Sequence, residues 1–66
     1  MNILCNGKNK VVDEGICIED LLLDLELNPD TVVVECNEQI VLREDYEGHI
    51  LKDGDVLELI RFVGGG

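Results

Sequence analysis

Apolar residues recur at every second position at the start of the chain, which is the pattern of a half-buried strand. In the segment MNILCN, the apolar series that begins at Met1 falls on one face, while Leu4 falls on the other face with two asparagines. Asn6-Gly7 follows, and this pair favours the positive φ angles of a two-residue hairpin turn. The segment KVVD supplies a short return strand, so the chain is predicted to begin with a β-hairpin.

The spacing of apolar residues changes to a helical period after this hairpin. One stripe at i, i+3, i+4 and i+7 is formed by Ile18, Leu21, Leu22 and Leu25. Cys17 stands where a capping hydroxyl is expected, and it predicts a poor N-cap because a thiol is a weak acceptor. Asn28-Pro29 predicts the end of the helix. Leu23 and Leu27 lie off the stripe and are expected to pack under a loop rather than to bind a partner.

The segment TVVVECNEQIVL predicts a second hairpin, with NEQ as its turn. Val33 shares one face with Glu35, and a charged residue marks the solvent side, so Val33 is expected to be exposed. The following segment, REDYEGHILKDGD, has no regular period. Its expected anchors in the core are Tyr46, Ile50 and Leu51.

The segment VLELIRFV predicts the last strand, whose two faces begin at Val56 and Leu57. The predicted order is therefore β-β-α-β-β-β, and one helix against one face of a sheet makes a two-layer α+β domain. The first and last strands are the most apolar, so they are expected to pair in parallel at the centre of the sheet. The 66 residues, of which 45% are hydrophobic, suit one domain with one core.

The chain is strongly acidic: fifteen acidic residues against five basic residues give a formal net charge of −10. Such a field disfavours nucleic acids and anionic membrane surfaces as partners. Two interpretations remain open, a surface that serves solubility and a surface that steers a basic partner protein. No segment is long and apolar enough to span a bilayer, and the first residues lack the pattern of a secretion signal, so a cytoplasmic location is expected.

The cysteines Cys5, Cys17 and Cys36 are odd in number and far apart in the sequence. A disulfide framework favours an even number, and a zinc site favours closely spaced Cys or Cys/His pairs. His49 is the only histidine, and it is interpreted as a structural loop residue. No metal site, no bound cofactor and no catalytic residue are therefore predicted, and the cysteines are interpreted as small apolar thiols in a reducing compartment.

Three glycines, Gly64, Gly65 and Gly66, follow the last predicted strand. Glycine has no side chain to pack and loses the most backbone entropy on ordering, so this run cannot stabilise the fold. The predicted organisation is a domain of residues 1–63 with a flexible tail of residues 64–66. From these residues alone, the tail is either inert or useful for its thinness and its free carboxylate.

Five segments, taken together, resemble the ubiquitin-like β-grasp proteins, and among them the ThiS-type sulfur carriers of thiamin (thiazole) biosynthesis. These segments are, in order, ILCNGK, EDLL, NEQIVLRE, HILKDGDVLEL and VGGG. The resemblance covers most of the chain, and its specificity lies in the combined order and spacing. It implies a mixed four- to five-stranded sheet packed on one main helix, with a flexible C-terminal glycine tail.

The resemblance implies a carrier rather than an enzyme. An activating enzyme would use ATP to adenylate the Gly66 carboxylate, and sulfur from a cysteine desulfurase or rhodanese-type protein would convert it to a thiocarboxylate. A thiazole synthase would then receive the sulfur. Gly64 and Gly65 would thread the tail into a buried active site, because only a backbone without side chains fits a narrow channel.

The resemblance also implies a docking surface on the sheet face opposite the helix. Its expected residues are Phe62, Ile60, Leu4, Val33 and Glu58. Phe62 is the expected anchor, because an exposed aromatic side chain near a reactive terminus suits a partner's pocket. Glu58 and Asp55 are expected to meet basic residues of the partner. For Leu4 and Val33, ordinary surface exposure without a partner remains the alternative.

Three other functions remain open. A molybdopterin-synthase small subunit shares the fold, the tail and the thiocarboxylate, although such chains are usually longer and carry extra helical segments. A ubiquitin-like protein modifier would use the same activated Gly66 to form isopeptide bonds with lysines. An acidic interaction domain with an inert tail would need none of this chemistry, and removal of Gly65 and Gly66 would leave its function unchanged.

Overall fold

The fold is taken from a computed structural model, which describes residues 1–62. The predicted tail and its boundary at Val63 lie outside these described residues. The elements, in chain order, are β1 (Asn2–Cys5), β2 (Lys8–Val11), α1 (Ile18–Asp24), the 3-10 helix η1 (Pro29–Thr31), β3 (Val32–Cys36), β4 (Gln39–Val41), the 3-10 helix η2 (Arg43–Asp45) and β5 (Val56–Arg61). The predicted order β-β-α-β-β-β is confirmed. No helix within residues 1–62 has the length and apolar character needed to cross a membrane.

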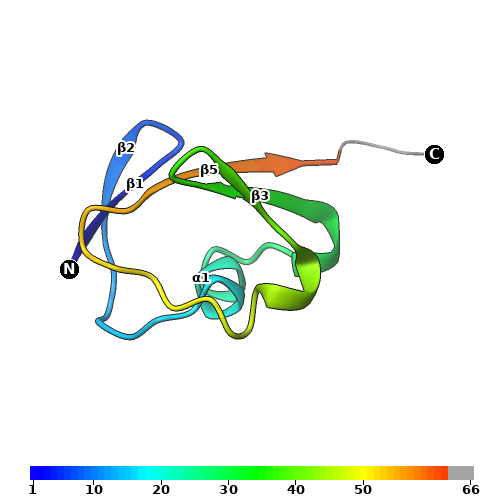
Figure 1. Cartoon of the computed structure of the whole chain (residues 1–66), viewed down its shortest axis with the longest axis horizontal. Coiled ribbons are helices and arrows are strands. Elements are labelled where there is room, and N and C mark those ends of the chain that lie inside the picture. Colours follow the sequence, from blue (N-terminus) through cyan, green and yellow to red (C-terminus); the bar gives the residue numbers. More distant parts are fainter. Residues whose placement is uncertain (63–66) are drawn as a thin grey trace.

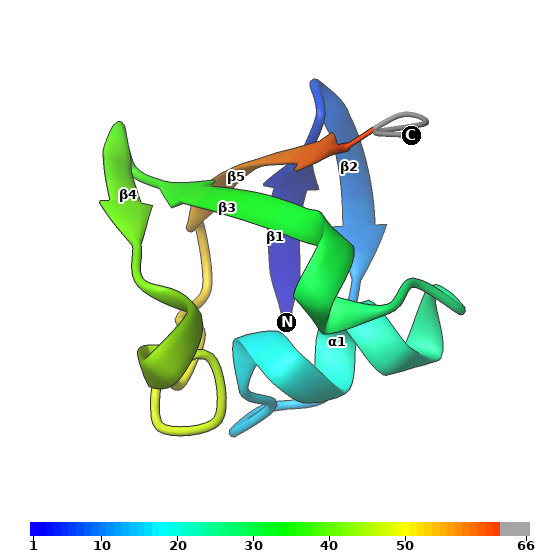
Figure 2. The ribbon, with the colours of Figure 1, turned by 90° about the vertical axis from the view of Figure 1, so that its right-hand side faces the viewer.

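The five strands form one mixed sheet in the order β2-β1-β5-β3-β4 (Figure 1). β1 and β5 run parallel, with Leu4 opposite Val56 and Cys5 opposite Leu57, whereas the other pairs are antiparallel. The predicted parallel pairing of the first and last strands is therefore correct. α1 lies against one face of the sheet, below the strands in Figure 2. This two-layer arrangement is the predicted α+β domain, and it is the ubiquitin-like β-grasp fold that the resemblance implied.

Both hairpins turn on two residues with positive φ angles. The first uses Asn6 at 52° and Gly7 at 80°, as predicted. The second uses Asn37 at 52° and Glu38 at 69°, so the predicted NEQ turn is one residue too long and Gln39 already belongs to β4. Glu38 adopts a left-handed conformation that is uncommon for a side chain of this kind. Its turn is held in place by the pairing of β3 and β4 on either side.

The two turn asparagines also lengthen the pairing with β5. The Asn6 side-chain oxygen accepts a hydrogen bond from the Leu59 N–H at 2.7 Å. In the same way, the Asn37 side-chain oxygen accepts from the Val56 N–H at 3.0 Å, and its amide donates to Asp55 Oδ1 at 3.0 Å. These side chains substitute for strand backbone where β1 and β3 have ended, so the N–H groups of Val56 and Leu59 in β5 keep a partner.

α1 begins as predicted but ends earlier. The Asp20 N–H donates to the Cys17 thiol at an N–S distance of 3.4 Å, which confirms the unusual cap. The helix ends at Asp24 with Leu25 as C-cap, and Glu26 follows with a φ of 61°, the left-handed geometry that commonly closes a helix. The predicted stop at Asn28-Pro29 is therefore wrong. Asn28 instead caps η1, where its side chain accepts from the Asp30 N–H at 2.9 Å.

The core lies between α1 and the inner face of the sheet. Its fully buried side chains are Ile3, Ile18, Leu21, Leu22, Val34 and Leu57. The predicted anchors Tyr46 and Leu51 are buried, but Ile50 is 50% exposed, so its prediction as an anchor is wrong. Leu27 packs against the core, as expected, whereas Leu23 is exposed on α1.

Tyr46 links the irregular segment REDYEGHILKDGD to the sheet through a hydrogen bond. Its buried hydroxyl donates to the Val32 carbonyl oxygen at 2.6 Å. β4 ends at Val41, opposite Val34, so Val32 lies beyond the reach of β4. The Tyr46 hydroxyl therefore satisfies a buried carbonyl that has no partner in the neighbouring strand.

We expect Tyr46→Phe to lower the free energy of unfolding by about 1–2 kcal/mol, because the buried Val32 carbonyl loses its donor while the ring volume is kept. The measurement is urea denaturation of both proteins, with the slope of the transition compared as well as its midpoint. An unchanged midpoint would mean that the hydroxyl contributes nothing to the stability of the fold.

Candidate functional site

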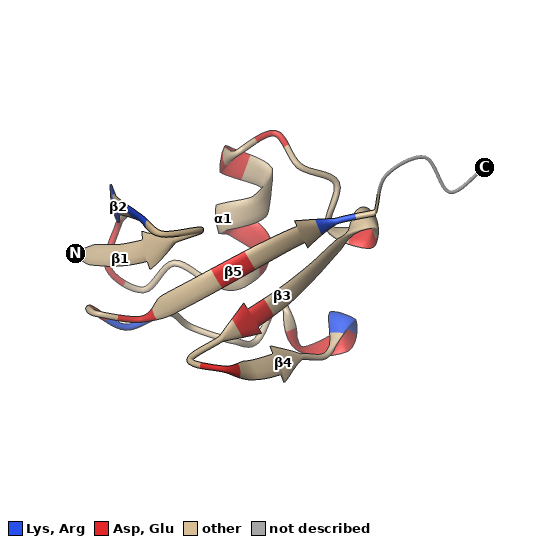
Figure 3. Cartoon of the chain, turned by 90° about the horizontal axis from the view of Figure 1, so that it is seen from above, with Lys and Arg blue, Asp and Glu red and all other residues tan. Residues whose placement is uncertain are grey.

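The sheet face that lies away from α1, called the outer face below, carries apolar and acidic side chains. They alternate along each strand with the residues that point into the core. On β1, β3, β4 and β5, the apolar and acidic residues of this face are Leu4, Val33, Glu35, Ile40, Val56, Glu58 and Ile60. Seen from above, β1, β5, β3 and β4 spread across this face (Figure 3).

The apolar part of the outer face follows β5 towards its carboxyl end. Ile60 is 50% exposed and pairs directly with Val33 of β3, while Leu4 lies on β1 next to the start of β5. The predicted outward direction of Leu4 and Ile60 is therefore correct. Val33 is half-buried rather than exposed, because the neighbouring side chains of β5 cover part of it.

Phe62 continues this line beyond the last residue of β5. Its N–H donates to the Thr31 carbonyl oxygen at 3.0 Å, which extends the antiparallel pairing of β3 and β5 by one step. The strand alternation then places Phe62 on the same side as Ile60. The side chain is 64% exposed, which makes it a large aromatic surface at the edge of the described chain.

The acidic part of the outer face contains a pair of like charges. Glu58 of β5 lies directly opposite Glu35 of β3 in the antiparallel register, and Figure 3 shows acidic positions in red on both of these strands. Like charges opposite one another destabilise a strand pair. Glu58 was predicted from the sequence to dock a partner, whereas Glu35 served only to identify the solvent side of its strand. The pairing of Glu35 with Glu58 was not predicted, because it depends on the register between two strands that are far apart in the sequence.

Two further apolar residues of the outer face were also missed. Val56 and Ile40 are exposed, on β5 and β4 respectively, and they widen the apolar surface on either side of the acidic pair. Asp55, which was expected to face a basic partner, is only 9% exposed. Its carboxylate instead accepts hydrogen bonds from the Lys52 N–H at 2.8 Å and the Asn37 amide at 3.0 Å, so this prediction is wrong.

Two of the cysteine thiols, Cys5 and Cys36, are not activated as nucleophiles. Burial raises the pKa of Cys5, with a smaller contribution from Glu58 in the same direction. Burial also raises the pKa of Cys36, and the neighbouring Asp55 carboxylate adds to the increase. A raised pKa keeps a thiol protonated at neutral pH, and the thiolate is the reactive form. Cys5, Cys17 and Cys36 are all free thiols.

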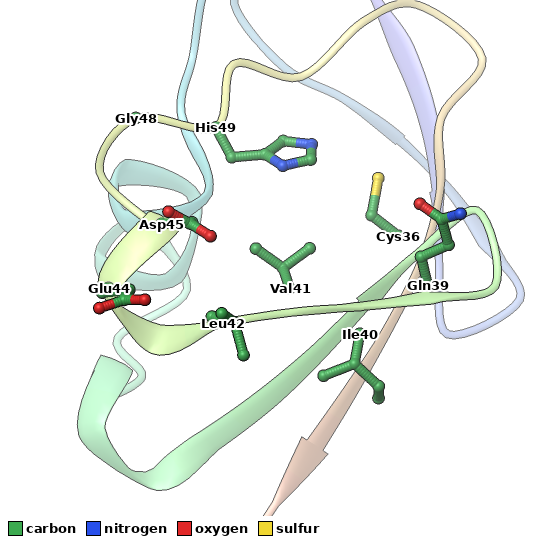
Figure 4. A pocket seen from close by; sticks show the side chains of 9 residues that line it. All are labelled: Cys36, Gln39, Ile40, Val41, Leu42, Glu44, Asp45, Gly48 and His49. Atoms are coloured by element: carbon green, nitrogen blue, oxygen red, sulfur yellow. The ribbon is translucent and has the colours of Figure 1, made fainter.

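The tertiary structure brings together one group of metal-ligand side chains that sequence spacing did not predict. The ligand atoms of Cys36, His49 and Asp55 lie within 4.8 Å of one another. Cys36 and His49 also line a cavity of about 520 Å³ beside β4 and η2 (Figure 4). These three residues are far apart in the sequence, so no local sequence motif predicted that they form a group.

Comparison with known proteins identifies relatives along the whole chain. The model of the ThiS family matches residues 3–66. The sulfur carrier protein ThiS of Bacillus subtilis is 45% identical over 62 residues, covering 92% of this chain and 94% of the relative. The thiazole synthase of Magnetococcus marinus is 36% identical over 66 residues, and the chain spans only 20% of that relative's length.

A solved structure agrees with these sequence relationships. The crystal structure of the thiamine biosynthesis protein ThiS from Geobacter metallireducens superimposes with a TM-score of 0.84 at 38% identity, and each chain is covered completely. The fold, the family model and the full-length relatives all lead to one assignment. This chain belongs to the ThiS family.

Proposed function

We propose that this chain is a sulfur carrier of thiamin biosynthesis that supplies the sulfur of the thiazole ring. The observation that carries the proposal is the match of the ThiS family model to residues 3–66, which includes the glycine run. Nearly complete coverage of a sulfur carrier protein from Bacillus subtilis supports the same assignment. In this role the chain is the substrate of its partner enzymes rather than a catalyst.

The proposed reacting group is the Gly66 carboxylate. A carboxylate is a poor electrophile, so an activating enzyme first joins it to AMP from ATP and releases pyrophosphate. A persulfide, supplied through a cysteine desulfurase or rhodanese-type protein, then displaces AMP and forms an acyl disulfide. Attack by a second thiol on that disulfide releases the thiocarboxylate, which passes its sulfur to thiazole synthase.

The thiazole synthase relatives support this choice of acceptor. In the Magnetococcus marinus protein, a segment similar to this entire chain occupies about a fifth of a polypeptide named thiazole synthase. Two modules joined in one polypeptide meet at a high effective concentration, which suits a carrier and the enzyme that it supplies. A thiazole synthase is therefore the proposed partner of this chain.

The outer face is the proposed docking surface for the activating enzyme and for thiazole synthase. Phe62, Ile60, Leu4 and Val33 form its apolar part, and the Glu35–Glu58 pair supplies negative charge. A basic residue of the partner placed between the two carboxylates would relieve their mutual repulsion, so binding would gain energy that the free carrier lacks. The surface lies beside the strand that leads to Gly66, so docking would direct the tail towards the partner's active site.

The proposed function is tested by intact-mass analysis. The protein is incubated with ATP, a sulfide source and the cognate activating enzyme, and the expected product has one oxygen replaced by sulfur. Deletion of Gly66 is expected to abolish this product. If an activating enzyme that is shown to be active on another carrier leaves the mass unchanged, the sulfur-carrier function is wrong for this chain.

Phe62→Ala is expected to weaken binding to thiazole synthase by about 2 kcal/mol, which is about thirtyfold in Kd, because an exposed aromatic anchor would be lost. Isothermal titration calorimetry with purified synthase measures the change. Leu23→Ala is the matched control, since Leu23 is an exposed leucine on α1, on the opposite layer of the domain. Equal affinities of the Phe62 variant and the parent protein would remove Phe62 from the interface.

A further inference from the structure

Three side chains with different ligand atoms converge where the irregular segment meets the sheet. Cys36 is the last residue of β3, Asp55 immediately precedes β5, and His49 lies in the loop that follows η2. The thiol sulfur, a carboxylate oxygen and an imidazole nitrogen lie within 4.8 Å of one another. In Figure 4, the His49 ring and the Cys36 thiol point into the same space above Val41.

We propose that Cys36, His49 and Asp55 form a binding site for one Zn²⁺ ion. Zinc prefers thiolate, imidazole and carboxylate ligands, and it accepts them together in one tetrahedral set. The Cys36 thiol would release its proton to solvent as the Zn–S bond forms. Three protein ligands leave a fourth position, and the adjoining cavity of about 520 Å³ gives solvent access to it. The site uses none of the residues of the outer face, so it does not depend on the sulfur-carrier function.

The Asp55 ligand is held in place before any ion binds. Its Oδ2 atom accepts the Lys52 N–H at 2.8 Å, and its Oδ1 atom accepts the Asn37 amide at 3.0 Å. A carboxylate oxygen can accept more than one bond, so both atoms keep a free lone pair for a cation. Hydrogen bonds that orient a ligand in this way are the usual outer shell of a protein metal site.

The other two ligands are fixed by the backbone around them. Cys36 lies between two strands, because it pairs with Gln39 of β4 and with Leu57 of β5. The His49 carbonyl oxygen accepts the Ile18 N–H at 3.0 Å, which anchors its loop to the start of α1. Little rearrangement is needed for these residues to close on an ion, and this reduces the entropy cost of binding.

The charge around the site favours a cation. Asp55 supplies one ligand charge, and Glu44 and Asp45 lie on the wall of the same cavity. The formal charge of the whole chain, −10, adds a long-range attraction of the same sign. A bound Zn²⁺ ion would link β3, β5 and the loop at His49, so its binding is expected to stabilise the folded domain.

Cobalt(II) titration tests the site directly, because cobalt replaces zinc with the same ligands and absorbs visible light. The full chain, free of any histidine tag and kept reduced, is expected to bind one Co²⁺ ion with a thiolate charge-transfer band in the near ultraviolet. Added Zn²⁺ should remove this band. Zn²⁺ at about a hundred times its Kd should also raise the melting temperature by roughly 10–20 °C.

Three variants assign the ligands. Cys36→Ser is expected to lose the charge-transfer band, and His49→Gln is expected to weaken Co²⁺ binding at least about tenfold. Cys5→Ser is the matched control, because Cys5 lies in β1 outside the group, and it should bind Co²⁺ as the parent does. His49 is only half-buried, so its variant remains informative if Cys36→Ser does not fold.

Two results would overturn the proposal. The first is the absence of a thiolate band and of any zinc-dependent rise in melting temperature in the parent protein. The second is a band that persists in folded Cys36→Ser, that is unaffected in His49→Gln, or that disappears in Cys5→Ser. The first result would mean that the chain has no such site, and any form of the second would assign the bound ion to other groups of the chain.

Discussion

Gly65→Ala is expected to slow adenylation of the chain by about a hundredfold while leaving the fold unchanged. The proposed reaction requires the Gly66 carboxylate to reach the α-phosphate of ATP inside the activating enzyme. A methyl group on the preceding residue adds bulk and restricts φ, so the carboxylate is displaced from its productive position. A displacement of about 1 Å at a reacting group can cost about a hundredfold in rate.

The measurement is the rate of carrier-dependent pyrophosphate release by the activating enzyme. Gly48→Ala is the matched control, because it makes the same chemical change in a loop where an added Cβ meets no atom within 4 Å. Gly48 also lacks the positive φ of Gly7, Gly15 and Gly54, so alanine causes no backbone strain there. If Gly65→Ala is adenylated as fast as the parent and the Gly48 control, a side chain at position 65 does not hinder entry of the tail into the active site, and the proposal is wrong on this point.

Leu57→Ala is expected to lower the free energy of unfolding by about 2–5 kcal/mol, the largest effect on stability that we predict. Leu57 is 0% exposed at the centre of the sheet, where it lies between Cys5 of β1 and Cys36 of β3. The alanine leaves a cavity that packed neighbours fill only in part. A domain of this size has only about 3–5 kcal/mol available, so much of the variant should be unfolded in water at 25 °C.

Urea denaturation followed by circular dichroism measures this loss. Val56→Ala is the control, because Val56 is the adjacent residue of β5 but points to the outer face and is 42% exposed. Its expected effect is below about 1 kcal/mol, the range of strand propensity. Similar losses for the two variants would contradict the division of β5 into a core face and an outer face.

The proposed docking role of the outer face gives a physical reason for the Glu35–Glu58 pair. Glu35 and Glu58 repel one another in the free domain, so they reduce its stability slightly. Binding surfaces often keep such unfavourable arrangements, because complementary charge on the partner removes the repulsion and increases specificity. The unusually acidic composition of the chain is consistent with a basic partner at this face.

The sequence by itself determined the features that depend on local periodicity. The alternation in MNILCN and VLELIRFV correctly placed Ile3 opposite Leu4 and Leu57 opposite Ile60 on the two faces of their strands, because the pleat of a strand sends neighbouring side chains to opposite faces. For VLELIRFV, the family resemblance rather than the alternation indicated which face is buried. The helical stripe correctly identified Leu21 and Leu22 as core residues for the same kind of reason. The Asn6-Gly7 turn was predicted correctly because the conformation of a two-residue turn depends on those two adjacent residues.

Only the tertiary structure decided the features that depend on neighbours distant in the chain. Ile50 is exposed and Val33 is half-buried because burial is set by what packs over a residue, and that cannot be read from a period. The Glu35–Glu58 pair exists through the register of β3 against β5. The group of Cys36, His49 and Asp55 likewise assembles only when β3, the loop after η2 and the start of β5 come together. Sequence patterns report short-range geometry, whereas sites of this kind are made by long-range contacts that form as the chain folds.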